Sequence, residues 1–195
     1  MAEPKRKATY DDVLAAPEHQ VAEILDGELF LSPRPTARHA TATSALGGDL
    51  SSAFHRPKGD PPRPGGWWII DEPELHFGAD VVVPDIAGWQ RDRMRRIPDA
   101  AWLELAPDWL CETLSPSTAR IDRTRKLAIY AREGVRHVWL VDPLARTLEV
   151  LAACRPMGDR RDARRRRGRA RRTVRCGRGR AGAPLDRLSA RCGHS

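Results

Sequence analysis

The sequence has few features that would direct the chain into a membrane or crosslink it. Only four of its 195 residues are cysteines, and none forms a C-x-x-C pair or stands near a histidine at zinc-finger spacing. No stretch approaches the roughly 20 apolar residues that span a bilayer, and the basic start, MAEPKRKATYDD, has no apolar run behind it. We therefore expect a cytoplasmic protein with no disulfide framework, no zinc finger and no membrane partner.

Positive charge is scarce in most of the chain, although the net charge is +8. Residues 1–150 hold 19 lysines and arginines against 23 acidic residues, a net charge of −4. Residues 151–195 hold 15 arginines, no lysine and three acidic residues, a net charge of +12. A basic protein is often a nucleic-acid binder, but here the basic character belongs to the C-terminal segment alone.

The length favours one domain with tails, because domains usually have roughly 100–200 residues. The segment 154–195 has no aromatic residue and few large aliphatic ones, so it cannot bury enough apolar area to offset chain entropy. We expect a domain over residues 9–153, a disordered N-terminus over 1–8 and a disordered Arg-rich tail over 154–195.

The first third of the domain combines helix and hairpin patterns. Residues 9–16 contain a threonine and an aspartate placed to cap a short helix. Asp26-Gly27 separates two β-rich runs and predicts a hairpin with a type I′ turn. Helical spacing of apolar residues over 36–55 predicts a second helix, and the proline-rich and glycine-rich stretch 56–66 is expected to be an exposed loop.

The remaining patterns are mainly those of buried strands. WWIIDEPELHF, ADVVVPDIAGW and DWLCETLSP are apolar runs of strand length. RIDRTRKLAIYAREG predicts a helix that ends at a glycine, and VRHVWLVDP and RTLEVLAA predict a final strand pair. The order α-β-β-α-β-β-β-α-β-β predicts an α/β (α+β) fold with a mixed central sheet flanked by helices.

One charged residue stands inside a predicted buried strand. Glu112 lies in the apolar run WLCETL, where an ionised carboxylate is costly unless a partner or a metal ion compensates it. Asp85 follows a proline in the preceding apolar run, and Lys126 lies on the next helix. Two carboxylates that hold a hard divalent cation, with a cationic side chain nearby, are what metal-dependent phosphodiester hydrolysis needs.

Several motifs give the sequence a specific resemblance. VAEILDGELFLSPRP, PDIAGW, CETLSPSTARIDRTRKLAIYAREGV and HVWLVDP together resemble the Uma-two family of restriction endonucleases, within the PD-(D/E)XK nuclease superfamily. The resemblance extends from about Tyr10 to Val150. It implies a restriction-endonuclease-like fold and Mg²⁺-dependent or Mn²⁺-dependent hydrolysis of DNA, and it leaves a homodimer open.

The resemblance also assigns roles to individual residues. Asp85 matches the aspartate of the P-D motif and Glu112 matches the (D/E) acid, and both are expected to be metal ligands. The usual E-x-K lysine is missing, because Leu114 occupies its position. Lys126 on the following helix takes that place, so the expected catalytic set is Asp85, Glu112 and Lys126.

Three supporting residues are weaker candidates, and each has a purely structural alternative. Asp122 lies one turn before Lys126 and either orients it or caps the helix. Glu23 and His39 match family positions near the site, although a strand glutamate and a histidine near a helix start are also common surface residues. Glu112 itself has an alternative as half of a structural ion pair with an arginine such as Arg120 or Arg123.

The tail allows two interpretations. Arg164, Arg165, Arg166 and Arg167 form a run that would add salt-sensitive, sequence-independent affinity for nucleic acid. A segment of arginine, glycine, alanine and cysteine without lysine is also what a shifted reading frame in GC-rich DNA would encode, and the resemblance stops near Leu151.

The expected function is therefore a metal-dependent DNA endonuclease. Two alternatives stay open: a nuclease-like DNA-binding or defence-associated module without turnover, and a frameshift-truncated copy without function. The net negative charge of residues 1–150 supports the alternatives, because phosphate-binding faces are normally cationic.

Overall fold

The computed structural model describes residues 6–59 and 64–153, and the backbone of 169–175. The helices and strands are α1 Tyr10–Leu14, β1 Gln20–Leu25, β2 Glu28–Pro33, α2 Ala37–Phe54, β3 Trp67–Asp71, β4 Leu75–Phe77, β5 Asp80–Val82, β6 Ile86–Gln90, β7 Trp109–Thr113, α3 Ala119–Ile121, the π-helix η1 Asp122–Lys126, α4 Leu127–Arg132, β8 His137–Asp142, β9 Thr147–Ala153 and β10 Arg169–Arg175. Within these ranges, no helix is long and apolar enough to cross a membrane.

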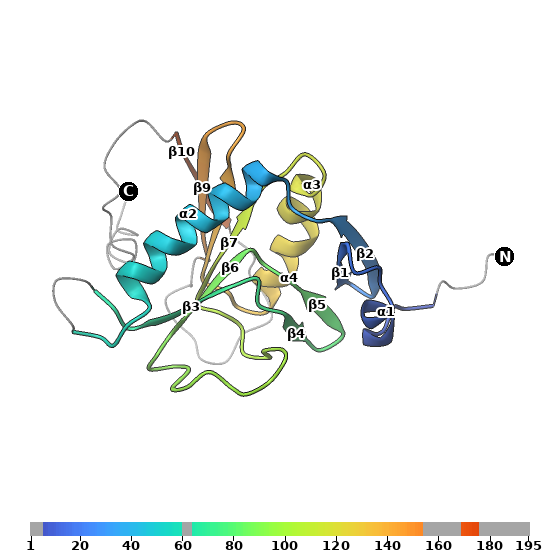
Figure 1. Ribbon diagram of the computed structural model, residues 1–195, viewed down its shortest axis with the longest axis horizontal. Helices are drawn as coiled ribbons and strands as arrows, with labels where there is room; N and C mark the ends of the chain where they lie inside the picture. The colour runs from blue at the N-terminus through green and yellow to red at the C-terminus, as the bar shows by residue number, and fades with distance from the viewer. Residues whose placement is uncertain (1–5, 60–63, 154–168, 176–195) are drawn as a thin grey trace.

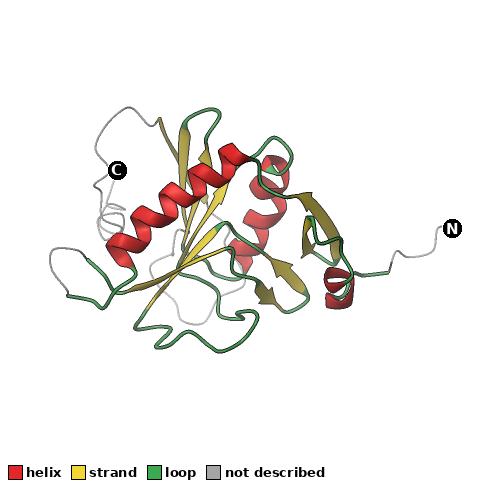
Figure 2. Ribbon diagram, viewed as in Figure 1, coloured by secondary structure: helices red, strands yellow, loops and turns green. Residues whose placement is uncertain are grey.

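The strands form two sheets (Figures 1 and 2). The smaller sheet has the strand order β2-β1-β5-β4, and the larger sheet has the order β10-β9-β8-β7-β6-β3. The pair β7 and β8 is parallel, while the other pairs within the sheets are antiparallel. A parallel pair needs a crossover, and α3, η1 and α4 supply it. The predicted mixed α+β fold is confirmed.

The predicted central sheet is divided because two of the apolar runs have a proline in their interior. Pro73 separates β3 from β4, and Pro84 separates β5 from β6. Proline cannot donate a ladder hydrogen bond and restricts the residue before it, so each run breaks there and its halves enter different sheets. The chain therefore passes twice through the junction between the sheets, and Glu72 in that junction has a positive φ of 46°.

The N-terminal hairpin follows the sequence prediction, but the segment before it does not. Asp26 and Gly27 have φ values of 54° and 80°, as a type I′ turn requires. Residues 6–8 were expected to be disordered, yet the amide of Ala8 donates to the carbonyl of Gly27 at 2.8 Å, and Arg6 pairs with Asp12 at 2.7 Å. These contacts hold the segment against the hairpin turn, and residues 1–5 lie outside the described ranges.

Both faces of the large sheet are covered. Helix α2 crosses one face (Figure 2) and packs there with a core cluster formed by Leu50, Phe54, Ile69, Ile86, Trp109 and Cys111. Leu110 points to the opposite face and belongs to the cluster that includes Leu127, Ile129 and Tyr130 of the crossover helix. Side chains alternate along a strand, so Glu112 shares the face of Leu110 and is directed toward α4.

The helix predicted over residues 120–134 is one helical segment with a π-helical turn in its middle. The turn spans Asp122–Lys126 between α3 and α4. The segment ends, as predicted, at Gly134, which has a φ of 79°. Because π turns concentrate at functional sites, the position of this one directs attention to Asp122 and Lys126.

Part of the tail differs from the sequence expectation. The segment Arg169–Arg175 was expected to be disordered, but it forms β10, which pairs antiparallel with β9 along all seven residues. Backbone pairing explains the difference, because β9 offers an open edge whose amides and carbonyls accept a further strand whatever its side chains are. Residues 154–168 and 176–195, including Arg164 to Arg167, lie outside the described ranges.

Candidate functional site

A cavity of about 750 Å³ lies where the two sheets meet. Its lining comes from α1, the β1–β2 hairpin, the start of α2, the 83–85 junction and the end of β7. The carboxyl ends of parallel strands in α/β sheets are common positions for ligand sites, and β7 ends here. All six of the non-tail candidate residues line this cavity: Glu23, His39, Asp85, Glu112, Asp122 and Lys126.

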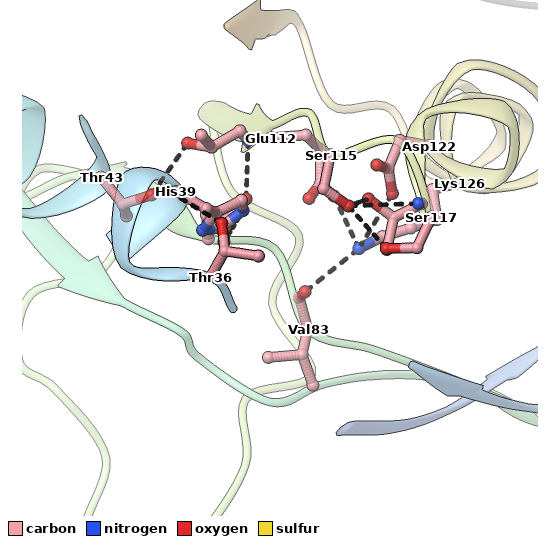
Figure 3. Close-up of polar contacts among 12 residues, drawn as sticks. Thr36, His39, Thr43, Val83, Glu112, Ser115, Ser117, Asp122 and Lys126 are labelled. Atoms are coloured by element: carbon pink, nitrogen blue, oxygen red, sulfur yellow. Dashed lines mark hydrogen bonds and ion pairs between the residues drawn. The ribbon is translucent and has the colours of Figure 1, made fainter. Parts of the chain in front are cut away.

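The ammonium group of Lys126 is the centre of the site (Figure 3). Its Nζ lies 2.9 Å from Oε1 of Glu112, 3.0 Å from Oε1 of Glu23 and 3.1 Å from the carbonyl oxygen of Val83. An ammonium has three N–H donors, so these three acceptors from β7, β1 and the junction satisfy it completely. Burial alone would lower the pKa of Lys126, but Glu112 and Glu23 raise it well above its usual value. Lys126 therefore stays charged.

Glu112 is held by two donors on a single oxygen. Besides Lys126, the hydroxyl of Tyr130 donates to the same Oε1. Glu112 is 3% exposed and Tyr130 is fully buried. Burial raises the pKa of Glu112 well above its usual value, and Lys126 offsets this only in part. The ion-pair partner of Glu112 among the described residues is Lys126, not Arg120 or Arg123, and Arg123 pairs with Glu149 instead.

Asp85 is anchored to the strand that carries Glu112. Its Oδ2 accepts a hydrogen bond from the amide of Thr113 at 2.6 Å. The hydroxyls of Thr113 and Thr43 lie 3.0 Å apart and link β7 to α2. Asp85 directly precedes β6, the antiparallel neighbour of β7. The geometry thus places the two acidic residues of the sequence motif side by side at one end of the large sheet.

His39 approaches Asp85 from the opposite direction, at the start of α2. Its Nε2 lies 3.3 Å from Oδ1 of Asp85, and its backbone amide is capped by the Thr36 hydroxyl at 3.4 Å. Hydrogen bonding to Asp85 raises the pKa of His39, while burial opposes the shift. His39 is only 8% exposed, so the alternative of an ordinary surface histidine is wrong.

Asp122 occupies the first position of the π turn, and its Oδ1 lies 3.9 Å from Nζ of Lys126. Its distance from the ammonium is longer than those of Glu112 and Glu23. Burial raises the pKa of Asp122 to about 6, with Lys126 and a hydrogen bond from Thr118 acting in the opposite direction. Asp122 therefore adds negative charge around Lys126 without a close contact to it.

The lining of the cavity is strongly acidic. Of the described residues that line it, seven have acidic side chains, and the basic ones are Arg34, Lys126 and His39. Such a surface attracts small cations and repels polyanions.

The donor set fits a hard divalent cation held by two carboxylates. Among the described residues, no group of three or more His, Cys, Asp or Glu side chains is placed to hold a metal ion. Mg²⁺ does not need such a group, because it usually keeps several waters and binds proteins through one or two carboxylates together with substrate phosphates. Asp85 and Glu112 provide two carboxylates at one end of the same cavity.

Sequence reasoning missed two contributors, Tyr130 and Val83. Tyr130 was not among the candidate residues predicted from the sequence, yet its hydroxyl donates to Glu112. The four-residue spacing of Asp122, Lys126 and Tyr130 was the available signal, because such residues share one helix face. Nothing in the sequence marked Val83, whose carbonyl and amide contact Lys126 and Glu23.

Comparison with known proteins identifies the class first. The structure is similar to a solved structure described as "Crystal structure of a putative nuclease belonging to DUF820 from Anabaena variabilis", with a TM-score of 0.66 and 24% sequence identity. The match covers 91% of this chain and 89% of the other. The two chains therefore share the same mixed α+β fold. No curated protein matches the sequence.

The family follows from the sequence itself. The family model Uma2, described as "Putative restriction endonuclease", matches residues 8–160. The chain belongs to the Uma2 family, and the family match extends beyond Leu151, where the motif resemblance stopped.

Proposed function

We propose that the protein is a metal-dependent DNA endonuclease whose reaction takes place at the cavity between the two sheets. One observation carries the proposal, the adjacency of two carboxylates at the end of β7. Glu112 is buried beside the charged Lys126, and Asp85 accepts a hydrogen bond from the amide of Thr113, the residue after Glu112. Family membership supports nuclease chemistry, and the acidic lining supports the choice of a divalent cation as cofactor.

In this proposal Asp85 and Glu112 hold Mg²⁺ or Mn²⁺. Bound there, the cation would supply a Lewis acid for the scissile phosphate and lower the pKa of a water molecule. Thr113 and His39 keep the carboxylate of Asp85 in place through contacts at 2.6 Å and 3.3 Å. A carboxylate held by two partners loses little further freedom when it binds a ligand.

Lys126 balances the charge of the acidic residues and supplies a cation near the reacting phosphate. Its three donors are occupied by protein acceptors, so it contacts a phosphate or water oxygen only by exchanging one of them. Glu23 can release it at low cost, because the amide of Val83 also donates to Oε1 of Glu23 at 2.7 Å. In this proposal Glu23 holds the ammonium group of Lys126 between turnovers. Asp122 contributes negative charge near that ammonium group without a close contact to it.

A second candidate is a nuclease-like module that binds DNA without cutting it. The satisfied ammonium of Lys126 favours it, because a lysine whose three N–H donors are taken by protein acceptors is not free to act on a phosphate. A cation-dependent cut distinguishes the two candidates.

The test is cleavage of a supercoiled plasmid by the full chain with Mg²⁺, Mn²⁺ or EDTA. We expect nicked or linear product with either metal and none with EDTA. Asp85→Asn and Glu112→Gln should each reduce the rate by roughly 100-fold or more, while keeping the shape of the replaced side chain. Asp99→Asn and Glu104→Gln are the matched controls, because both residues are exposed and outside the cavity lining.

Two results would contradict the proposal. Cutting that persists at the wild-type rate in both site variants would show that the activity lies elsewhere. DNA binding without cutting at any metal concentration, by a folded wild-type chain, would favour the binding module.

A further inference from the structure

The buried hydroxyl of Tyr130 contacts the site, although Tyr130 is not one of the motif residues. Tyr130 lies on α4, one turn beyond Lys126, and it is fully buried. Its hydroxyl donates to Oε1 of Glu112. Because the ring has no access to the cavity lining, Tyr130 acts on a ligand only through Glu112.

Both side-chain contacts of Glu112 with described residues are made by the same oxygen. Nζ of Lys126 lies 2.9 Å from Oε1, and the Tyr130 hydroxyl donates to Oε1 as well. Two donors on one carboxylate oxygen fix the rotation of the carboxylate group about its last bond. They leave Oε2 as the oxygen that is available to the cavity.

Lys126 and Tyr130, the two donors to Glu112, lie on one face of the helical segment formed by η1 and α4. Asp122, Lys126 and Tyr130 follow at intervals of four residues through η1 and the start of α4. Val135 and Ile129 in the buried cluster around Tyr130 keep its ring in place.

We propose that Tyr130 is a positioning residue that, together with Lys126, directs Oε2 of Glu112 to the divalent cation. This inference rests on the proposed function, since it assumes that Glu112 is a metal ligand. Groups that hydrogen-bond a metal ligand orient it and tune its affinity, and their loss typically costs about 10-fold to 100-fold in metal affinity or activity.

Tyr130→Phe removes only the hydroxyl and keeps the buried ring. Tyr10→Phe is the matched control, because Tyr10 is the only other tyrosine in the chain and lies on α1, outside the cavity lining. Mn²⁺ affinity is measured by isothermal titration calorimetry on the full chain without DNA. We expect Tyr130→Phe to weaken Mn²⁺ binding about 10-fold and Tyr10→Phe to leave it unchanged.

A second measurement separates positioning from a general loss of structure. Plasmid cleavage by Tyr130→Phe should recover to within about threefold of wild type when Mn²⁺ is raised to saturate the weakened site. A merely structural defect would not be corrected by metal. Thermal unfolding in EDTA shows whether the variant is folded at the assay temperature.

The outcomes distinguish the positioning role of Tyr130 from the proposed function. If Mn²⁺ binds the wild type, Glu112→Gln loses that binding and Tyr130→Phe keeps it unchanged, the positioning role is wrong while the proposed function stands. If the folded wild type binds no Mn²⁺, the metal site and the positioning role both fail.

Discussion

Replacing Asp122 with asparagine should stabilise the metal-free protein at alkaline pH and have little effect in acid. Burial raises the pKa of Asp122 from 3.8 to about 6, despite the opposing effects of Lys126 and Thr118. Well below pH 3.8 the carboxyl group is neutral in the folded and the unfolded chain. Between about pH 3.8 and pH 6 the unfolded chain loses the proton while the folded chain keeps it, so the free energy of unfolding falls across this window and levels off above it.

The size of the effect follows from the shift. A difference of roughly two pKa units, at about 1.4 kcal/mol per unit, corresponds to about 3 kcal/mol of lost stability at pH 8. Asparagine has nearly the same shape and no charge, so it avoids this loss. At pH 4 the unfolded carboxyl is already partly ionised, so the stability difference between Asp122→Asn and wild type should increase by about 2–3 kcal/mol between pH 4 and pH 8.

Urea unfolding in EDTA, followed by tryptophan fluorescence at both pH values, measures this difference. Asp99→Asn, in an exposed loop, is the control for a lost surface carboxylate. If the difference between Asp122→Asn and wild type is the same at pH 4 and pH 8, the buried acidic cluster does not exist as described.

Three further predictions concern the contacts around the site and its helix. Lys126→Met should destabilise the metal-free protein by about 3–5 kcal/mol at pH 8, because it leaves Glu112 and Glu23 buried without a cation. The loss should shrink as the pH falls, because burial raises the pKa of Glu112 and so favours its neutral form. The exposed Lys58→Met is the control and should change the free energy of unfolding by less than about 0.5 kcal/mol. His39→Asn should lower the free energy of unfolding in urea by about 1–2 kcal/mol at pH 6 and by less at pH 9. The contact with Asp85 raises the pKa of His39, and the stability that it contributes is lost as the pH rises above that pKa. An equal loss at both pH values would show that the contact carries no charge. Gly134→Ala should cost about 1 kcal/mol, because φ is 79° and a Cβ atom would meet nothing within 4 Å; a thermal melt that matches wild type would mean that the helix does not end in this conformation.

Local patterns predicted most of the elements correctly. The Asp26-Gly27 turn, the helix over 37–54 and the glycine end at Gly134 all depend on backbone preferences within a few residues, and all three are confirmed. The separation of the apolar runs into two sheets was not predicted. Which partner each half-strand finds depends on long-range pairing, although Pro73 and Pro84 marked the breaks.

The site was predicted only in part, because some of its contacts also depend on long-range pairing. A buried glutamate in an apolar strand is visible in the sequence, and the family motif added Asp85 and Lys126. The sequence did not show that Lys126 would be shared between β7 and β1, because that contact requires the two sheets to meet at Val83. The π turn was also not predicted, since it differs from an α-helix by only one residue in its hydrogen-bond register.

A double-mutant cycle on plasmid cleavage tests the central claim most directly, that Asp85 and Glu112 act as one metal-binding unit. Initial rates in saturating Mg²⁺ would be compared for wild type, Asp85→Asn, Glu112→Gln and the double variant. If both residues hold one cation, each single change removes it, and the double variant should be no slower than the slower single variant. Losses that multiply in the double variant, or a single variant that cuts at the wild-type rate, would contradict the claim.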